Sequence, residues 1–349
     1  MAKLLHGLSR AAPGLVALRP TLSAESLRPG MLLKLGGHAE ELHAALLCWR
    51  GGVALAAAVS GWPHSPRVHT GEVPDDAKRA ELVDGVVSVC PEASDAASAA
   101  GLPAIIDCFG NLISLPIEDC SGPTNTGVSK RLPLMATSPA QADLQPIHAS
   151  LHTGTAAVDV LTPIGRGQTM LMIGPRGTGK SSIVLDAIIA QAATSVSCIL
   201  ALSVPDAKHA ADITSWLCDR ADAYMARNQG QGILQKPLRA RLTVIAPRSD
   251  SAAEHTLVTA AACALGERIR NSGGHSLVVL DTWRGPCEVW DEAGAAASGF
   301  MNLQGAHAML TIGDEVDQEV AKATRRLEQV ITRQPVSYTH LTLPTKRIV

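Results

Sequence analysis

Residues 169–192 read TMLMIGPRGTGKSSIVLDAIIAQA, and the fold of the chain follows from this stretch. A short apolar run over 170–173 ends at Gly174, the motif GPRGTGKS follows, and an amphipathic run begins near Lys180. The motif fits G-x-x-x-x-G-K-[ST], the phosphate-binding P-loop, and its flanks predict the strand and the helix that such a loop needs. The competing interpretation is a chance glycine-rich turn, which would not require both flanks.

The residue types of this loop suit a nucleotide bound with Mg²⁺. The glycines let successive backbone N–H groups face one anion, and the start of the helix adds the positive end of its dipole. Lys180 would reach the β- and γ-phosphates, and the hydroxyl of Ser181 would ligate the metal. The expected cofactors are ATP or ADP with Mg²⁺. The predicted nucleotide-binding residues are Gly174, Arg176, Gly177, Thr178, Gly179, Lys180, Ser181 and Ser182.

Asp281 is the second predicted metal residue. It follows the apolar run 277–280, which predicts a strand. In P-loop NTPases an aspartate at the end of a neighbouring strand holds the Mg²⁺ shell, so Asp281 and Ser181 form the predicted metal site. The alternative is a solvated aspartate at a strand end.

Composition limits the possible function classes. The 349 residues leave room for two domains, and a net charge of −2 argues against a nucleic-acid-binding surface. Hydrophobic residues make up 46% of the chain but aromatic residues only 3%, so small aliphatic side chains must fill the core. The eight cysteines include no C-x-x-C pair, which excludes a common zinc spacing and predicts reduced, mostly buried thiols. No apolar run is long enough to cross a bilayer.

Residues 1–28 are basic, contain serines and have no acid before Glu25, and their leucines suggest a loosely helical apolar stripe. This pattern is typical of an organelle transit peptide, with a disordered cytosolic terminus as the alternative. It favours a mitochondrial location, at the matrix side of the inner membrane, over a plastid or cytoplasmic one.

Residues 29–98 contain short apolar runs at 31–35, 44–49, 53–59 and 82–89, separated by glycine, proline and charged residues. This spacing predicts a small β-rich domain, a barrel or a sandwich, although the alanine content leaves a partly helical structure open. A strand at 104–106 and a turn at 108–111 follow. A connector rich in Ser, Pro and Thr then runs to about residue 145.

From residue 151 strands alternate with helices. The predicted strands are 169–173, 197–204, 242–246 and 276–280, and the predicted helices are 180–192, 207–226 and 252–270. This order predicts an α/β fold of the RecA-like P-loop NTPase type over 99–335, with a parallel sheet covered by helices on both faces. Residues 229–241 are expected to form an exposed loop. A helix at 295–303, a strand at 307–312 and a helix at 318–332 are weaker expectations, and 336–349 looks like a non-native tail.

The stretch before the P-loop carries a resemblance to a known family. Residues 151–168 read LHTGTAAVDVLTPIGRGQ, which resembles the pattern L-x-T-G-x-x-A-[IV]-D-x-L-x-P-I-G-R-G-Q in the α subunits of F-type ATP synthases. Three further segments are similar to that family: AIIDCFGN at 104–111, SDSAA at 249–253 and GERIRNSGGHSLVVLD at 266–281. The resemblance covers about 104–281, and beyond Asp281 the sequence no longer follows it.

The resemblance implies a non-catalytic, nucleotide-binding α-type subunit of a proton-transporting ATP synthase, which contributes to ATP synthesis coupled to proton transport. Its implied partners are catalytic β subunits in a ring and the central stalk, with no nucleic acid and with the membrane reached only through the complex. The helical C-terminal domain of the family, and the arginine it supplies to the neighbouring catalytic site, have no counterpart here. We therefore expect either a truncated gene product or a diverged paralogue.

One departure from the family concerns activity. Catalytic β subunits carry a glutamate at the end of the second strand and α subunits a glutamine, whereas this chain has Pro205. Proline can neither accept a proton nor orient a water molecule, which favours a catalytically silent protein, although Asp206 is adjacent. The alternatives are an autonomous NTPase of a related branch, such as a secretion-type ATPase or a Rho-like translocase, and a degenerate nucleotide-binding paralogue.

Overall fold

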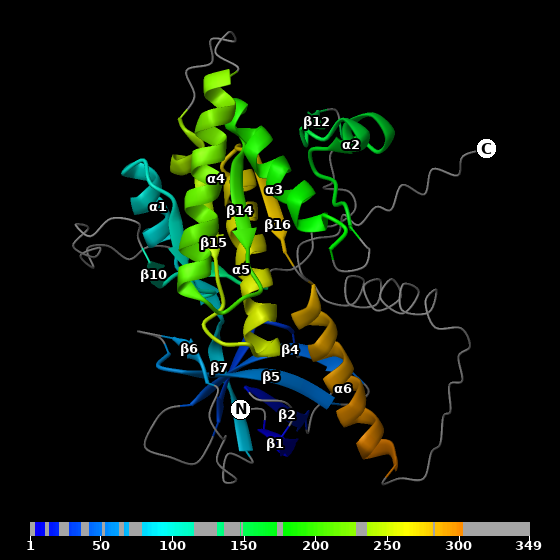
Figure 1. The fold of residues 1–349 in the computed structure, drawn as a ribbon. Helices are drawn as coiled ribbons and strands as arrows, with labels where there is room; N and C mark the ends of the chain where they lie inside the picture. The colour runs from blue at the N-terminus through cyan, green and yellow to red at the C-terminus, as the bar shows by residue number, and fades with distance from the viewer. Residues whose placement is uncertain are drawn as a thin grey trace.

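The computed structural model describes residues 4–10, 14–20, 28–35, 42–50, 53–62, 66–69, 79–114, 131–135, 147, 149–172, 177–227, 236–281 and 283–302. An antiparallel β domain lies at the bottom of Figure 1, and a mixed α/β sheet with its helices stands above it. The expectations for 307–312, 318–332 and 336–349 fall outside the described residues.

The β domain is a small barrel. Its strands are β1 (Leu4–Arg10), β2 (Leu15–Pro20), β3 (Met31–Leu35), β4 (His43–Arg50), β5 (Val53–Ser60), β6 (Arg67–Val68) and β7 (Arg79–Val86). They pair antiparallel in the order β2-β1-β7-β3-β4-β5-β6, and a further pairing of β2 with β5 closes the ring. Closure removes the free edges that an open sheet would expose. The predicted barrel-like domain is confirmed.

Strand β5 is buried on both faces from Val53 to Val59, which explains the uninterrupted apolar sequence VALAAAV. Ala54, Ala56 and Ala58 belong to the cluster inside the barrel, where small side chains suit the narrow interior. Leu55 and Ala57 point the other way, into a cluster shared with the α/β domain.

The boundary expected at residue 29 is wrong, because β1 and β2 belong to the barrel and the domain therefore begins by residue 4. The helical stripe expected in this segment is wrong as well. On a strand alternate side chains point to opposite faces, so Leu18 lies inside the barrel and Leu15 packs toward the α/β domain.

The second sheet has the strand order β10-β9-β15-β14-β16. Its members are β9 (Ala104–Ile106), β10 (Leu112–Ser114), β14 (Ser197–Ala201), β15 (Leu242–Ile245) and β16 (Ser276–Leu280). Strands β9, β15, β14 and β16 run parallel, and β10 is an antiparallel edge strand. Two separate two-stranded pairings complete the described strands: β8 (Ser88–Val89) with β11 (Leu132–Pro133), and β12 (Ser150–Leu151) with β13 (Ile164–Gly165).

Helices cover both faces of this sheet, as expected. One face carries α3 (Lys180–Ala190), η3 (Gln191–Ala193), α4 (Ala207–Arg227) and η4 (Leu238–Arg241). The other carries α1 (Glu92–Ala99), α5 (Ala252–Asn271) and α6 (Arg284–Asn302). The alternation is visible on β14, where Cys198 and Leu200 face the first group and Ile199 faces the second. Helix α6 begins at Arg284, well before the helix predicted at 295–303.

The strand predicted at 169–173 is wrong for residues 169–172, which form neither strand nor helix, while 173–176 lie outside the described residues. Leu171 is 39% exposed, which does not suit a strand buried in a parallel sheet. The apolar run is only four residues long, and such a run alone does not fix a strand. The segment leading to the P-loop instead holds the β12–β13 pair and the short helix α2 (Ala156–Leu161).

Candidate nucleotide-binding site

The P-loop glycines that the structure describes adopt the backbone conformation the motif requires. Gly177 has φ 80° and Gly179 φ 83°, in the left-handed region that glycine adopts without strain. A Cβ at either position would meet nothing within 4 Å. Glycine is therefore required here for its backbone conformation, and not because a side chain would clash. Gly174 and Arg176 fall outside the described residues.

Helix α3 begins at Lys180, immediately after Gly179. Lys180 is half-buried, and Thr178, Ser181 and Ser182 are exposed. The first turn of α3 contains no acidic residue of its own, so no side chain within that turn offsets the positive end of the helix dipole. This end of the helix therefore favours an anion.

Asp281 lies at the end of β16, beside this helix start. In the parallel pair of β14 with β16, Ala201 stands opposite Leu280, and the Asp281 amide donates to the Ala201 carbonyl at 3.0 Å. The Ser181 hydroxyl donates to Asp281 Oδ1 at 3.4 Å, across a hundred positions of sequence. The fold thus brings the two predicted metal residues together. A hydroxyl and a carboxylate are the hard oxygen donors that Mg²⁺ prefers, so these residues fit the ion.

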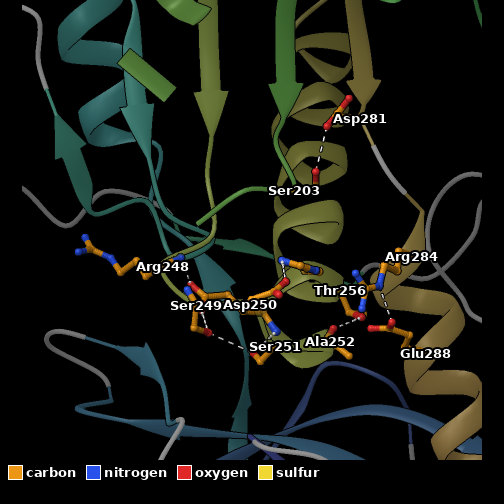
Figure 2. A network of polar contacts seen from close by, with 12 residues as sticks. Ser203, Arg248, Ser249, Asp250, Ser251, Ala252, Thr256, Asp281, Arg284 and Glu288 are labelled. Atoms are coloured by element: carbon orange, nitrogen blue, oxygen red, sulfur yellow. Dashed lines mark hydrogen bonds and ion pairs between the residues drawn. The ribbon is translucent and has the colours of Figure 1, made fainter. Parts of the chain in front are cut away.

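Ser203 is a member of this cluster that the sequence did not reveal. Its hydroxyl donates to Asp281 Oδ2 at 3.0 Å (Figure 2). With the bond from Ser181 to Oδ1, each carboxylate oxygen accepts one hydroxyl. The sequence signal that could have identified Ser203 is its position just past the carboxyl end of β14. The carboxyl ends of neighbouring parallel strands lie together, so residues that follow them come close in space.

Pro205 and Asp206 follow in the loop before α4, and both are exposed. Asp206 Oδ1 accepts the backbone N–H of Lys208 at 2.9 Å, and its carbonyl accepts the Ala210 amide at 3.0 Å. These bonds cap the start of α4, which is a common structural role of aspartate. The alternative raised by the sequence, a catalytic Asp206, gains no support from this arrangement.

The motif at 151–168 has a structural explanation in Asp159. Its carboxylate accepts the Thr153 amide and hydroxyl, both at 2.8 Å, and the Gly154 amide at 3.1 Å. Burial acts to raise the pKa of Asp159, but these hydrogen bonds, aided by the charge of His152, outweigh it and lower the pKa. The ionised carboxylate therefore holds this turn closed at neutral pH.

The same segment is attached to the P-loop helix. The Gln191 side chain at the end of α3 donates to the His152 carbonyl at 2.8 Å. The Gly165 amide donates to Gln168 Oε1 at 2.7 Å, and a Cβ on Gly165 would lie 2.3 Å from Ile147 Cγ2. The segment that leads to the P-loop is thus attached at His152 to the far end of the helix that the loop begins.

Two other segments singled out by the sequence brace the loop after β15. Asp107, 1% exposed, accepts the Phe109 and Asn111 amides and the Arg248 Nε–H, each at 2.9 Å. The buried Glu254 carboxylate accepts the Arg248 amide at 2.7 Å. These contacts connect the β9–β10 turn, the β15 loop and the start of α5, which is a structural role.

Comparison with known proteins identifies the α/β part of the chain. Residues 154–305 match the model of the ATP synthase alpha/beta family, nucleotide-binding domain. The chain is 34% identical over 171 residues to ATP synthase subunit alpha of Haemophilus ducreyi. The aligned region covers 49% of this chain and 30% of that protein. It is 32% identical over 177 residues to the subunit alpha of Aquifex aeolicus, covering 51% and 31% of the two chains. The chain thus spans about a third of the length of these relatives.

The comparisons also correct two expectations. The family match extends to residue 305, so the chain follows the family beyond Asp281 and through α6. The relatives give no support to a mitochondrial location. Within the described ranges, no helix combines the length and apolar character needed to cross a membrane. With its P-loop, its parallel sheet and this match, the segment 154–305 is a nucleotide-binding domain of the ATP synthase alpha/beta family.

Proposed function

We propose that this protein binds ATP or ADP with Mg²⁺ at the loop 174–182 and at Asp281. The observation that supports this most directly is the contact between Ser181 and Asp281, because it joins the P-loop to the strand end that would hold the metal shell. The glycine-rich backbone would cradle the phosphates, and Lys180 would neutralise the terminal phosphate charge. Mg²⁺ would be held by Ser181 and Asp281, and when bound it would offset the charge of the β- and γ-phosphates.

We further propose that nucleotide turnover is negligible. Pro205 lies in the loop between β14 and α4, where the catalytic members of the family carry their glutamate, and it has no side-chain acceptor to polarise an attacking water. Its neighbour Asp206 caps α4 through the Lys208 amide. An autonomous NTPase, the main alternative, would need a general base from elsewhere in the chain.

The function that best fits a binding site without turnover is that of an α-type, non-catalytic subunit of a proton-transporting ATP synthase, working beside catalytic subunits. The similarity to proteins named ATP synthase subunit alpha supports this assignment. It predicts that affinity-tagged protein, expressed in its own host, co-purifies with ATP synthase β subunits. Recovery of a monomer free of those subunits would favour the degenerate paralogue. Fractionation of the same cells, followed by detection of the tagged protein in each fraction, would test the mitochondrial location.

Nucleotide binding is tested by titrating purified protein with a fluorescent ATP analogue in Mg²⁺. We expect saturable binding that Lys180→Ala abolishes and that Lys236→Ala leaves unchanged. Lys236 is a suitable control because it is exposed and precedes β15 at the opposite end of the sheet. Absence of binding at millimolar nucleotide would refute the binding site, and steady ATP hydrolysis that Lys180→Ala removes would refute the silent role.

A further inference from the structure

Ser203 makes a contact that the P-loop motif does not require. It lies two residues beyond the last ladder pair of β14, and its hydroxyl reaches across to Asp281 Oδ2 on the neighbouring strand at 3.0 Å. Strand β14 is fixed on both sides, by β15 and by β16. The hydroxyl is therefore supplied from the loop that directly follows a central strand, and Figure 2 shows it beside Asp281.

Asp281 needs such support because of its position. It follows the last residue of β16 and is exposed, so packing does not restrict its carboxylate. Its other oxygen, Oδ1, accepts the hydroxyl of Ser181 at 3.4 Å, a long and therefore weak hydrogen bond. The shorter bond from Ser203 is the one that holds the carboxylate with Oδ1 toward the P-loop.

The two hydroxyls differ in what happens when a metal binds. A hydroxyl that ligates a cation does so through its oxygen and turns its hydrogen away, so the bond from Ser181 to Asp281 would be given up. Ser203 contacts the other oxygen, Oδ2, from the loop after β14, so its hydrogen bond can persist when the metal is bound. Asp206, the nearest acid in the same loop, is engaged by the Lys208 amide.

We propose that Ser203 is a positioning residue for the metal: its hydroxyl holds Asp281 Oδ2 so that Oδ1 faces Ser181 and the bound Mg²⁺. This inference rests on the proposed nucleotide-binding function and adds a residue outside the P-loop. Partners that orient a metal-binding carboxylate change metal affinity by about 10- to 100-fold when they are removed. Because the carboxylate is exposed, the lower end of that range applies.

The test separates metal-dependent from metal-independent binding. For wild type and Ser203→Ala, the dissociation constant of an ATP analogue is measured in Mg²⁺ and again in EDTA, and Mn²⁺ affinity is measured by electron paramagnetic resonance with nucleotide present. We expect Ser203→Ala to weaken nucleotide binding in Mg²⁺, and Mn²⁺ binding, about 10-fold, with binding in EDTA unchanged. Ser203→Thr, which keeps the hydroxyl, restores the wild-type values.

Ser197→Ala is the matched control, because Ser197 is the first residue of β14 and lies at the opposite end of that strand from Ser203. Equal weakening of binding in Mg²⁺ and in EDTA would overturn the inference, since it would mean that Ser203 only stabilises the fold. Unchanged metal affinity in Ser203→Ala would overturn it as well. If wild type binds no nucleotide in either buffer, the proposed function itself fails, and the inference fails with it.

Discussion

Among single residues, Glu267 on α5 has a carboxylate that is largely removed from solvent. Its Oε1 atom is buried and has no hydrogen-bond partner among the described residues. Burial raises the pKa of Glu267 from 4.5 to about 7, and the charge of Arg270 only partly opposes this. The folded protein therefore binds a proton at mildly acidic pH that the unfolded chain has already released.

The contribution of Glu267 to the free energy of unfolding should consequently fall as the pH rises from about 4.5 to about 7, because the folded state must give up a proton that it binds more tightly than the unfolded chain does. Glu267→Gln removes this titration. At pH 8 we expect the variant to exceed wild type by about 1 kcal/mol in the free energy of unfolding, after allowance for solvent screening of a partly exposed group. At pH 4.5 the two should be nearly equal. Urea unfolding at both pH values measures the difference.

The control is Glu81→Gln, which removes an exposed carboxylate on β7. As a surface substitution it should change the free energy of unfolding by about 0.5 kcal/mol or less. A difference between Glu267→Gln and wild type that is the same at pH 4.5 and pH 8 would contradict the explanation by burial.

At the same scale, the sequence predicted the site in part. Ser181 and Asp281 were identifiable because each belongs to a local pattern, a P-loop and the end of an apolar strand. Ser203 belongs to no motif. Its role arises from the pairing of β14 with β16, a contact that the sequence places 78 positions apart.

Among the elements, the turn between β9 and β10 contains a close approach of two backbone segments. Gly110 has φ 91°, and a Cβ there would lie 2.0 Å from the backbone oxygen of Cys90. A hydrogen bond from the Cys90 amide to the Phe109 carbonyl, at 2.9 Å, keeps the backbone of Cys90 close to Gly110. Because the atom in the way belongs to the backbone, no side-chain rotation can relieve the clash.

Gly110→Ala should therefore destabilise the protein by about 2–4 kcal/mol, from backbone strain together with steric overlap. Gly101→Ala isolates the first of these terms, because Gly101 has φ 76° and a Cβ there would meet nothing within 4 Å. It should cost only about 1 kcal/mol. Chemical denaturation of both variants gives the comparison, and equal losses would show that the close approach to Cys90 contributes nothing.

The elements also show where sequence patterns suffice. The strands β3, β9 and β16 begin and end at the predicted residues, because each is an apolar run bounded by residues that break strands. The patterns failed at residues 1–28 and 169–172. There leucine spacing and short apolar runs fit more than one structure, and only pairing with a partner strand distinguishes them.

In the whole molecule, the barrel and the α/β domain share one hydrophobic cluster. It joins Leu55 and Ala57 on the outer face of the barrel to Leu257 on α5 and Val289 and Trp290 on α6. Helix α6 contacts both β4 and β5 (Figure 1). Trp290 is 3% exposed and lies in this cluster, so the two domains should unfold as one unit.

Trp290→Ala should lower the free energy of unfolding by about 3–5 kcal/mol through lost burial and a cavity. Hydrogen exchange should then accelerate together in β5 and in α5, although they belong to different domains. Trp216→Ala is the control. Trp216 is 44% exposed on α4 and contacts Arg220, so its loss should cost about 1 kcal/mol or less. Faster exchange confined to one domain would contradict the shared core.

The sequence by itself determined the P-loop, the alternating α/β pattern and the family resemblance, because these depend on residues close together along the chain. The tertiary structure decided what depends on residues far apart. It closed the barrel through β2 and β5, which brought the first residues into the domain. It also placed Ser203 against Asp281 and Asp206 at the cap of α4. The physical reason is that hydrogen bonds between strands and packing across a core are set by spatial neighbours, whose identity local patterns do not contain.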